Sequence, residues 1–174
     1  MVTTLIGIGI LLGVIVLLGL IMPKEMIIEK SISISRSLTE VYDFLKQTKN
    51  QDKFSVWNMA DPNMKKEHRG SDGSVGFVYA WDSTNKNVGA GEQETKVLEE
   101  NKRIEYELRF IRPMQNVAKS QFNLTASGGN QTTVMWGFYG PSKFPMNIMS
   151  PVFKNMLSKD LEKSLANLKN HLEK

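Results

Sequence analysis

The first pattern along the chain is an apolar segment at its N-terminus. Residues 1–23 carry no charged side chain, and the run from Leu5 to Met22 contains no polar side chain at all. An α-helix of that length spans about 27 Å, close to the ~30 Å hydrocarbon core of a bilayer. The pattern predicts one transmembrane helix that anchors the chain in a membrane.

A secretory signal peptide is the alternative interpretation of the same segment. Such a peptide has a basic start, an apolar run of roughly 7–15 residues and a small-residue cleavage site. Here the chain starts Met-Val-Thr-Thr, the apolar run is longer, and it ends in Ile-Met-Pro-Lys. We therefore predict an uncleaved single-pass anchor over residues 1–23 and a globular domain over residues 24–174.

The charges next to the apolar segment bear on its orientation. Lys24, Lys30 and Arg36 follow the segment, whereas only the α-amino group precedes it. Because positively charged flanks tend to stay on the cytoplasmic side, we expect a membrane protein whose globular domain lies in the cytoplasm.

The globular segment begins with a strand and a short helix. Period-two alternation of isoleucines over residues 26–36 is typical of a half-buried strand. Ser37 and Glu40 then have the spacing of a capping box, which predicts a helix over roughly residues 38–48. We expect irregular structure from residue 49 to residue 63.

Short alternating runs, separated by Gly- and Asn-containing turns, make up the middle of the chain. Each run places alternate apolar side chains on one face: Val75, Phe77, Tyr79 and Trp81; Ile104, Tyr106, Leu108 and Phe110; Phe122 and Leu124; and Val134, Trp136 and Phe138. Regular short strands with tight turns predict an antiparallel meander.

A long amphipathic helix ends the chain. Ser150 and Pro151 supply a helix cap and a proline at the first helical position. Apolar residues then recur every three or four positions from Val152 to Leu172, which gives one apolar stripe. The stripe needs an apolar surface to cover, and the meander supplies one, so the sequence predicts an α+β domain.

Composition excludes several classes of function. The chain has no cysteine, so it has no disulfide, thiolate metal site or cysteine nucleophile, and its two histidines lack the spacing of metal ligands. The excess of 22 Lys+Arg over 18 Asp+Glu is small for a nucleic-acid-binding protein, and the aromatic residues alternate into the predicted core. We expect no metal, no nucleotide cofactor and no nucleic-acid partner.

Several motifs occur in the order found in a known superfamily. They are Ser37 to Leu45 as the first helix, Trp57 with Asp61-Pro62, Gly73-Ser-Val-Gly76 leading to Trp81, Gly89-Ala-Gly91-Glu92, Thr132-Thr-Val-Met-Trp136, and Asp160 to Lys169. In these motifs, over about residues 26–172, the chain resembles the START/Bet v 1-like (SRPBCC) superfamily, of the polyketide cyclase/dehydrase and lipid-transport type. The resemblance implies a helix-grip fold, in which a curved antiparallel β-sheet wraps around the long C-terminal α-helix. Here one transmembrane helix would precede it.

The resemblance also implies a hydrophobic cavity between sheet and helix that binds lipids, sterols, polyketides or other apolar molecules, and no shared set of catalytic residues. We predict that the ligand-binding side chains are Trp57, Phe77, Trp81, Tyr106, Phe110, Phe122, Trp136, Met149, Phe153 and Met156. A polar group at the end of the cavity, from Tyr106, Glu92 or His68, would orient the ligand.

The expected function is membrane-anchored binding, or transport, of a hydrophobic small molecule or lipid. One alternative is a cyclase-like enzyme, which needs a titratable side chain inside the cavity, with His68 as the candidate base. The other is an interaction domain whose aromatic residues fill the core completely. The sequence names neither the ligand nor the oligomeric state.

Overall fold

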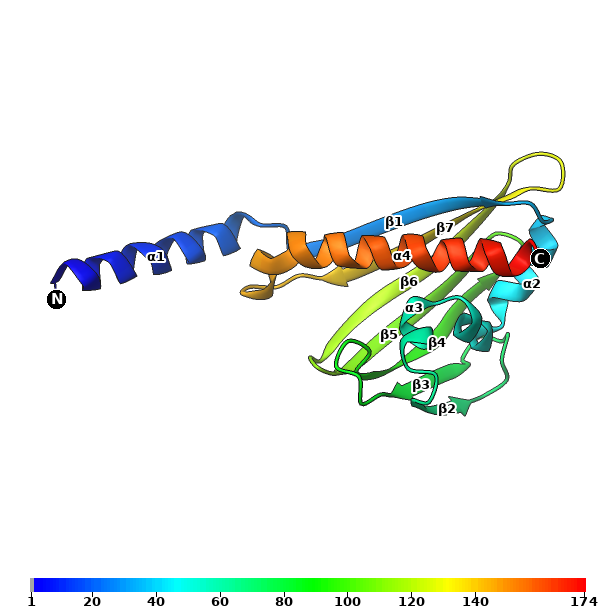
Figure 1. Cartoon of the computed structure of the whole chain (residues 1–174), viewed down its shortest axis with the longest axis horizontal. Coiled ribbons are helices and arrows are strands. Elements are labelled where there is room, and N and C mark those ends of the chain that lie inside the picture. The colour runs from blue at the N-terminus through cyan, green and yellow to red at the C-terminus, as the bar shows by residue number, and fades with distance from the viewer. Residues whose placement is uncertain (1) are drawn as a thin grey trace.

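Seven antiparallel strands form one curved sheet in the order β1-β7-β6-β5-β4-β3-β2 (Figure 1). The strands are β1 (Glu25–Ile34), β2 (Lys65–Arg69), β3 (Val78–Asp82), β4 (Ala90–Glu99), β5 (Arg103–Arg112), β6 (Asn116–Ala126) and β7 (Thr132–Pro141). The helices are α1 (Val2–Ile21), α2 (Leu38–Lys46), α3 (Val56–Ala60) and α4 (Ser150–Leu172), with short 3-10 helices η1 (Thr48–Lys53) and η2 (Met146–Met149). This computed structural model describes residues 2–174, apart from the side chains of Val2, Thr3, Leu5, Leu11, Leu12 and Ile15.

The predicted capping box is confirmed at the start of α2. The Glu40 backbone N–H donates to Ser37 Oγ at 3.3 Å, and the Ser37 backbone N–H donates to Glu40 Oε2 at 3.0 Å. These two bonds satisfy donors that would otherwise have no partner at the helix terminus. The helix ends at Lys46, two residues before the predicted boundary, and buries Val41 and Leu45.

The expectation of irregular structure over residues 49–63 is wrong, because η1 and α3 lie there. Neither helix is long enough to show a repeating apolar stripe, so periodicity does not reveal them. Tertiary contacts hold them: the Val56 backbone N–H donates to Ser164 Oγ of α4 at 3.0 Å, and Asn167 Nδ2 donates to the Phe54 carbonyl at 3.1 Å.

The meander is present, but its first strand is shorter than predicted. Tyr79 and Trp81 share the inner face of β3, whereas Val75 lies before the strand and is 62% exposed. Gly76, between Val75 and Phe77, has a φ of 86°, which interrupts the extended backbone and the alternation with it. The three later runs lie on β5, β6 and β7 with the predicted residues facing inward.

The sheet bends at its β4–β5 pair. The register between these strands shifts twice, between Ala90 and Gly91 and between Thr95 and Val97. Such bulges bend a strand and increase its twist. At the first shift the indole of Trp81 lies over Gly91, where an added Cβ would come within 2.8 Å of the ring.

Helix α4 crosses the concave face of the sheet but packs tightly along only part of its length (Figure 1). Leu161, Ser164, Leu165 and Leu168 are buried, and all lie in its C-terminal half. In the N-terminal half, residues 151–156 are exposed. The apolar stripe predicted from the sequence is therefore buried at one end and largely uncovered at the other.

The start of α4 also differs from the prediction. Ser150 is the first helical residue rather than the cap, because η2 leads directly into α4 and Met149 occupies the N-cap position without a side-chain bond. The hydroxyl of Ser150 instead bonds with that of Ser142.

Helix α1 precedes β1 and projects away from the rest of the domain (Figure 1). Asn147 Nδ2 donates to the Gly19 carbonyl at 2.6 Å, which joins the end of α1 to η2. Within the described residues, no helix is both long enough and apolar enough to cross a membrane. The structure thus does not support the anchor predicted over residues 1–23, a segment in which Met1 and six side chains lie outside the described residues.

The bond from Val56 to Ser164 yields a stability prediction. Replacing Ser164 with alanine leaves the half-buried Val56 N–H without its acceptor, which costs about 1–3 kcal/mol. We expect the Ser164→Ala variant to lose that amount of unfolding free energy in urea titrations. Ser158→Ala is the control on the same helix, because Ser158 makes no side-chain hydrogen bond to the described residues; equal losses in the two variants would contradict the prediction.

Candidate functional site

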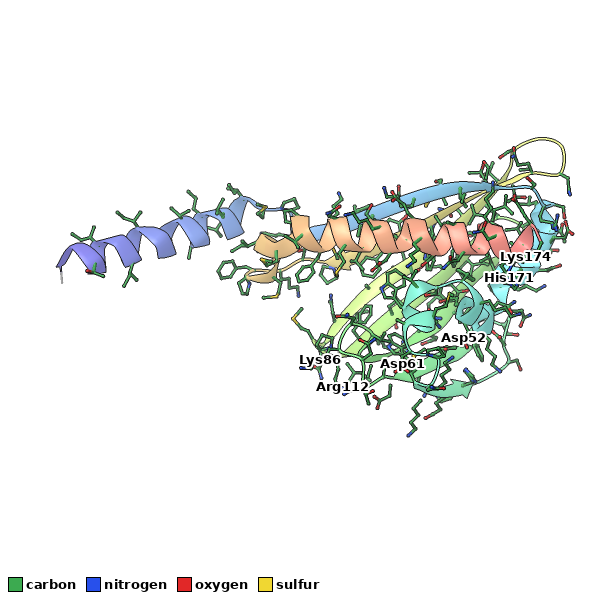
Figure 2. The ribbon with its side chains drawn as sticks, in the orientation of Figure 1. Asp52, Asp61, Lys86, Arg112, His171 and Lys174 are labelled. Carbon is green, nitrogen blue, oxygen red and sulfur yellow. The ribbon has the colours of Figure 1, made fainter. Side chains whose placement is uncertain are left out.

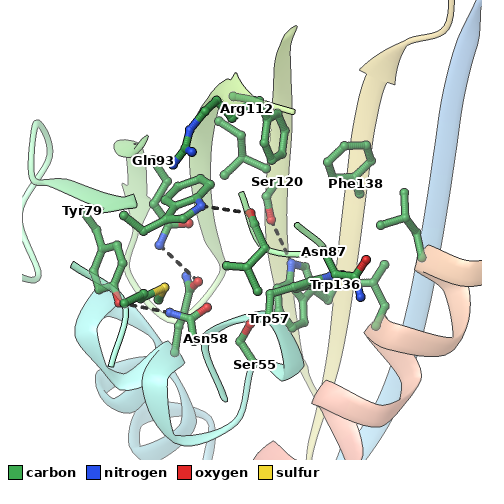
Figure 3. Close-up of a pocket in the computed structure, with 18 of the residues that line it drawn as sticks. Ser55, Trp57, Asn58, Tyr79, Asn87, Gln93, Arg112, Ser120, Trp136 and Phe138 are labelled. Carbon is green, nitrogen blue, oxygen red and sulfur yellow. Dashed lines mark hydrogen bonds between the residues drawn. The ribbon is translucent and has the colours of Figure 1, made fainter. Parts of the chain in front are cut away.

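A cavity of about 270 Å³ lies between the concave face of the sheet and helices α3 and α4 (Figure 3). Strands β3 to β7 contribute its floor, while Trp57 of α3 and Met156, Leu157 and Leu161 of α4 contribute its cover. Most of the lining is apolar. Its volume lies just below the ~300–1,000 Å³ of typical small-molecule sites, so it fits a small ligand.

Two pairs of aromatic rings form part of the cavity wall. The rings of Trp57 and Trp136 meet edge to face with centroids 6.0 Å apart, and those of Trp81 and Phe110 do so at 6.1 Å. Such pairs are favourable beyond the area they bury, so they hold the walls in fixed orientations. Trp81 is also held by its indole N–H, which donates to the Val88 carbonyl at 3.3 Å.

A charged network lies behind one wall. Asp52 Oδ1 accepts hydrogen bonds from the Tyr79 hydroxyl at 2.6 Å and from Asn58 Nδ2 at 2.8 Å, and Lys66 Nζ donates to Asp52 Oδ2 at 2.8 Å. Burial by itself would raise the pKa of Asp52, but the bonds from Lys66, Tyr79 and Asn58 outweigh it and lower that pKa. Burial and the bond to Asp52 raise the pKa of Tyr79 far above its usual value. Tyr79 and Asn58 present this network to the cavity.

A pair of glutamine side chains forms a second polar feature of the lining. Gln93 Nε2 of β4 donates to Gln51 Oε1 of η1 at 3.1 Å, and both side chains are buried (Figure 3). Nearby, the indole N–H of Trp136 donates to Ser120 Oγ at 2.8 Å. These groups are uncharged, so the cavity combines apolar walls with a few neutral hydrogen-bonding positions.

Five of the ten predicted ligand-binding residues line the cavity: Trp57, Trp81, Phe110, Trp136 and Met156. They come from five different elements, α3, β3, β5, β7 and α4, which the fold brings together. That they contact a ligand stays a prediction.

Three others are buried and do not line the cavity. Tyr106 is fully buried and its hydroxyl donates to the Leu45 carbonyl at 3.2 Å. Phe122 packs beneath Trp136, with ring centroids 4.6 Å apart. Phe77 packs with Met64 and Tyr79. All three face inward as predicted, but they fill close-packed parts of the interior.

Met149 and Phe153 are the remaining two, and both are exposed, at 45% and 39%. They lie at the N-terminal end of α4, where the helix is not covered by the sheet. An apolar position on a helical stripe therefore does not by itself place a side chain in the cavity.

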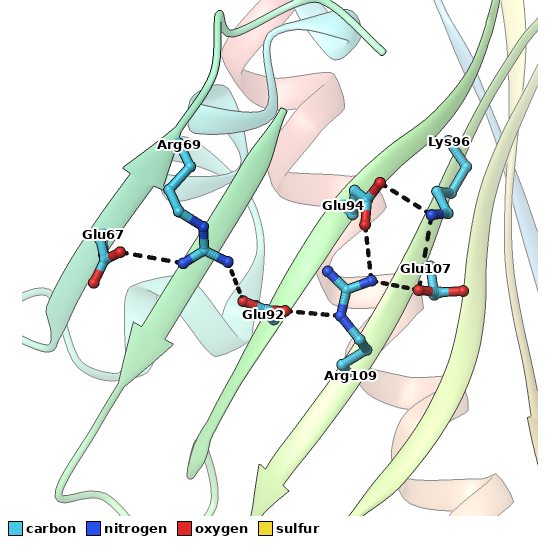
Figure 4. Close-up of polar contacts among 7 residues, drawn as sticks. All are labelled: Glu67, Arg69, Glu92, Glu94, Lys96, Glu107 and Arg109. Atoms are coloured by element: carbon cyan, nitrogen blue, oxygen red, sulfur yellow. Dashed lines mark hydrogen bonds and ion pairs between the residues drawn. The ribbon is translucent and has the colours of Figure 1, made fainter. Parts of the chain in front are cut away.

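Glu92 does not orient a ligand, because it lies on the outer face of the sheet (Figure 4). It alternates with Gly91 and Gln93, which face inward, and it pairs with Arg69 and with Arg109 Nε at 2.8 Å. The bond to Arg69, and after it the bond to Arg109, lowers the pKa of Glu92. Arg109 also contacts Glu94 at 2.8 Å. The network is a solvent-facing feature.

Neither histidine reaches the cavity. His68 is largely exposed on β2, where its ring lies 5.0 Å from that of Tyr79. Partial desolvation of the ring, together with the nearby charge of Lys49, lowers the pKa of His68. His171 lies near the C-terminus against Phe44, at 5.1 Å (Figure 2). Across the described part of the chain, no group of three or more His, Asp or Glu side chains is arranged to hold a metal.

The polar lining residues Gln51, Asn58, Gln93 and Ser120 were missed by the sequence analysis. Gln93 and Ser120 carried a usable signal, because each occupies an inward position in the alternation of its strand. Gln51 and Asn58 did not, because they lie in or beside the short helices that the pattern did not reveal.

The lowered pKa of Asp52 yields a pH prediction. A carboxyl whose pKa is lower in the folded state than its ordinary 3.8 stabilises the fold above that value and loses this contribution as the pH falls through the lowered pKa. We expect the stability advantage of the wild type over Asp52→Asn to be present at pH 7 and to shrink between about pH 5 and pH 2. Urea unfolding across this range measures it, with Asp160→Asn as the control, and an advantage that is constant or grows would contradict it.

Comparison with known structures shows the same fold at low sequence identity. Norcoclaurine synthase from Thalictrum flavum has a TM-score of 0.63 at 10% identity, over 86% of this chain and 95% of that one. The Aha1 dimer from Colwellia psychrerythraea gives 0.60 at 19% identity, over 85% and 96%. DynU16, from the dynemicin biosynthetic locus, gives 0.59 at 13%, and the match covers 84% of this chain but only 47% of DynU16.

No curated protein matches the chain. A family model described as polyketide cyclase/dehydrase and lipid transport matches residues 26–173, which include every residue of the cavity. On this match over most of its length, the chain belongs to the polyketide cyclase/dehydrase and lipid-transport family, of the Bet v 1-like (SRPBCC) superfamily.

Proposed function

We propose that this domain binds a small hydrophobic molecule in the cavity between its sheet and α4. The observation that carries the proposal is the apolar cavity itself, because close-packed interiors rarely leave a space of about 270 Å³ between aromatic walls. Burial of apolar ligand surface would supply the affinity, at roughly 25 cal/mol per Å² before the costs of association. Membership of the family supports the same proposal.

Binding without catalysis fits the described lining best. Its titratable side chains are Tyr79 and Arg112. Tyr79 donates a hydrogen bond to Asp52, and its strongly raised pKa keeps its hydroxyl protonated at neutral pH, so it does not serve as a base. Arg112 is ion-paired with Asp82 at the opening. Neither is placed to exchange a proton with a substrate.

Filling the cavity tests the proposal. Leu108 of β5 lies on the floor, so Leu108→Trp places an indole in the space that a ligand would occupy. We expect native mass spectrometry of the purified full chain to detect a bound small molecule on the wild type, identifiable after organic extraction. Its occupancy should fall at least about fivefold in the variant, because overlap with the ligand removes contacts along one face.

Val117→Trp is the matched control, because Val117 lies on the outer face of the neighbouring strand and is 54% exposed. It should leave occupancy unchanged. Equal occupancy in the wild type and in a folded Leu108→Trp variant, or no retained molecule in any preparation, would refute binding in this cavity.

The membrane anchor and a transport role stay predictions of the sequence. We propose the anchor because the run from Leu5 to Met22 is uninterrupted by polar side chains. If residues 1–23 anchor the chain, the full-length protein should remain in the membrane pellet after alkaline carbonate extraction. A version that begins at Lys24 should be in the supernatant, and release of both versions would refute the anchor.

A further inference from the structure

Three polar side chains in the cavity wall are almost completely buried. Gln51, Gln93 and Ser120 are each 6% exposed, yet they line a space whose other walls are mostly apolar. Burying an amide or a hydroxyl costs free energy unless it is hydrogen-bonded. The partners of these three groups therefore indicate what the cavity is built to receive.

The glutamine pair retains unused hydrogen-bonding capacity. An amide side chain has two N–H donors and one carbonyl acceptor. The bond from Gln93 Nε2 to Gln51 Oε1 uses one donor of Gln93. Its second N–H and its carbonyl oxygen make no hydrogen bond with the described residues. The oxygen is also not completely enclosed by protein atoms. Gln93 thus offers both a donor and an acceptor at the cavity surface.

Ser120 offers a second donor. Its Oγ accepts from the indole N–H of Trp136 at 2.8 Å, so the hydroxyl hydrogen is directed away from that ring. Ser120 of β6 pairs with Tyr106 of β5, and Gln93 of β4 pairs with Leu108 of β5. Tyr106 and Leu108 are successive inward-facing residues of β5, so β5 separates Ser120 from Gln93. A ligand bound over β5 would therefore have one of these polar positions on each side of it.

The same lining lacks a free charge. Arg112 is exposed at the opening and paired with Asp82. Behind the wall, Lys66 is paired with Asp52. A carboxylate or phosphate that entered the cavity would lose its hydration without gaining an unpaired cation, which is a large cost.

We propose that the cavity selects an uncharged molecule whose apolar body carries a carbonyl or hydroxyl oxygen, and that Gln93 and Ser120 bind that oxygen. This inference rests on the proposed function, because it names the ligand class of the same cavity. It assigns specificity to the polar positions and affinity to the aromatic walls.

Three probes with one common ring system test it: 2-acetylnaphthalene, 2-ethylnaphthalene and 2-naphthoate. Equilibrium dialysis against the full-length protein measures each affinity. We expect 2-acetylnaphthalene to bind the wild type more tightly than 2-naphthoate does. In the Gln51→Leu/Gln93→Leu double variant, the affinity ratio of 2-acetylnaphthalene to 2-ethylnaphthalene should fall about tenfold from its wild-type value.

Replacing both glutamines avoids leaving one buried amide without its partner. Gln121→Leu is the matched control, because Gln121 lies on the outer face of β6 and bonds Asn123 there; it should keep the wild-type ratio. Ser120→Ala, which keeps both amides, should lower the ratio as well and serves if the double variant does not fold.

An unchanged ratio in the folded variants, or tighter binding of 2-naphthoate than of 2-acetylnaphthalene, would overturn the selection of an uncharged oxygen. In both cases, binding of 2-ethylnaphthalene would leave the proposed function intact. If none of the three probes binds, the proposed function falls together with this inference.

Discussion

The site depends on how α4 packs against the sheet, which is close along the C-terminal half of the helix and loose before it. The C-terminal half of the helix inserts Leu161, Leu165 and Leu168 into the core, next to Ile34, Val134 and the other buried residues of β1 and β7. Lys30 of β1 also pairs with Glu162 at 2.5 Å, which joins the sheet to the helix along this half. Toward the N-terminus of α4, residues 151–156 are exposed. Near the middle of the helix, Met156, Leu157 and Leu161 face the curved sheet across a space that is not filled, and that space is the cavity.

Strand alternation separates the chemistry of the two faces of the sheet. The outer face carries Glu92, Glu94, Glu107 and Arg109 in an ion-pair network, whereas the inner face of the same strands carries Gln93, Leu108 and Phe110. One residue of register decides whether a side chain meets water or ligand. The cavity can therefore remain uncharged although the strands that form it are rich in glutamate and arginine.

The relation to other proteins lies in the fold rather than in the residues of the site. At 10–19% identity, the likeness to norcoclaurine synthase, the Aha1 dimer and DynU16 shows the shared helix-grip arrangement alone. What the cavity of this chain can bind follows from its own lining: the four aromatic wall residues, the glutamine pair and Ser120. A fold of this kind sets where a ligand lies, and the lining sets which ligand it is.

Local patterns in the sequence determined the capping box at Ser37, the inward positions of β5, β6 and β7, and the long final helix, because each depends on neighbouring residues and one fixed period. They also placed Trp57, Trp81, Phe110, Trp136 and Met156 near a common interior. Only the tertiary structure decided that Tyr106 and Phe122 fill the core while Trp136 borders a cavity, since all three have the same inward alternation. It also placed Gln51 and Asn58 in the cavity wall. Both lie in helices too short to show a repeating apolar pattern in the sequence. The physical reason is that the remaining space depends on the distance between sheet and helix, which long-range packing sets and no local pattern encodes.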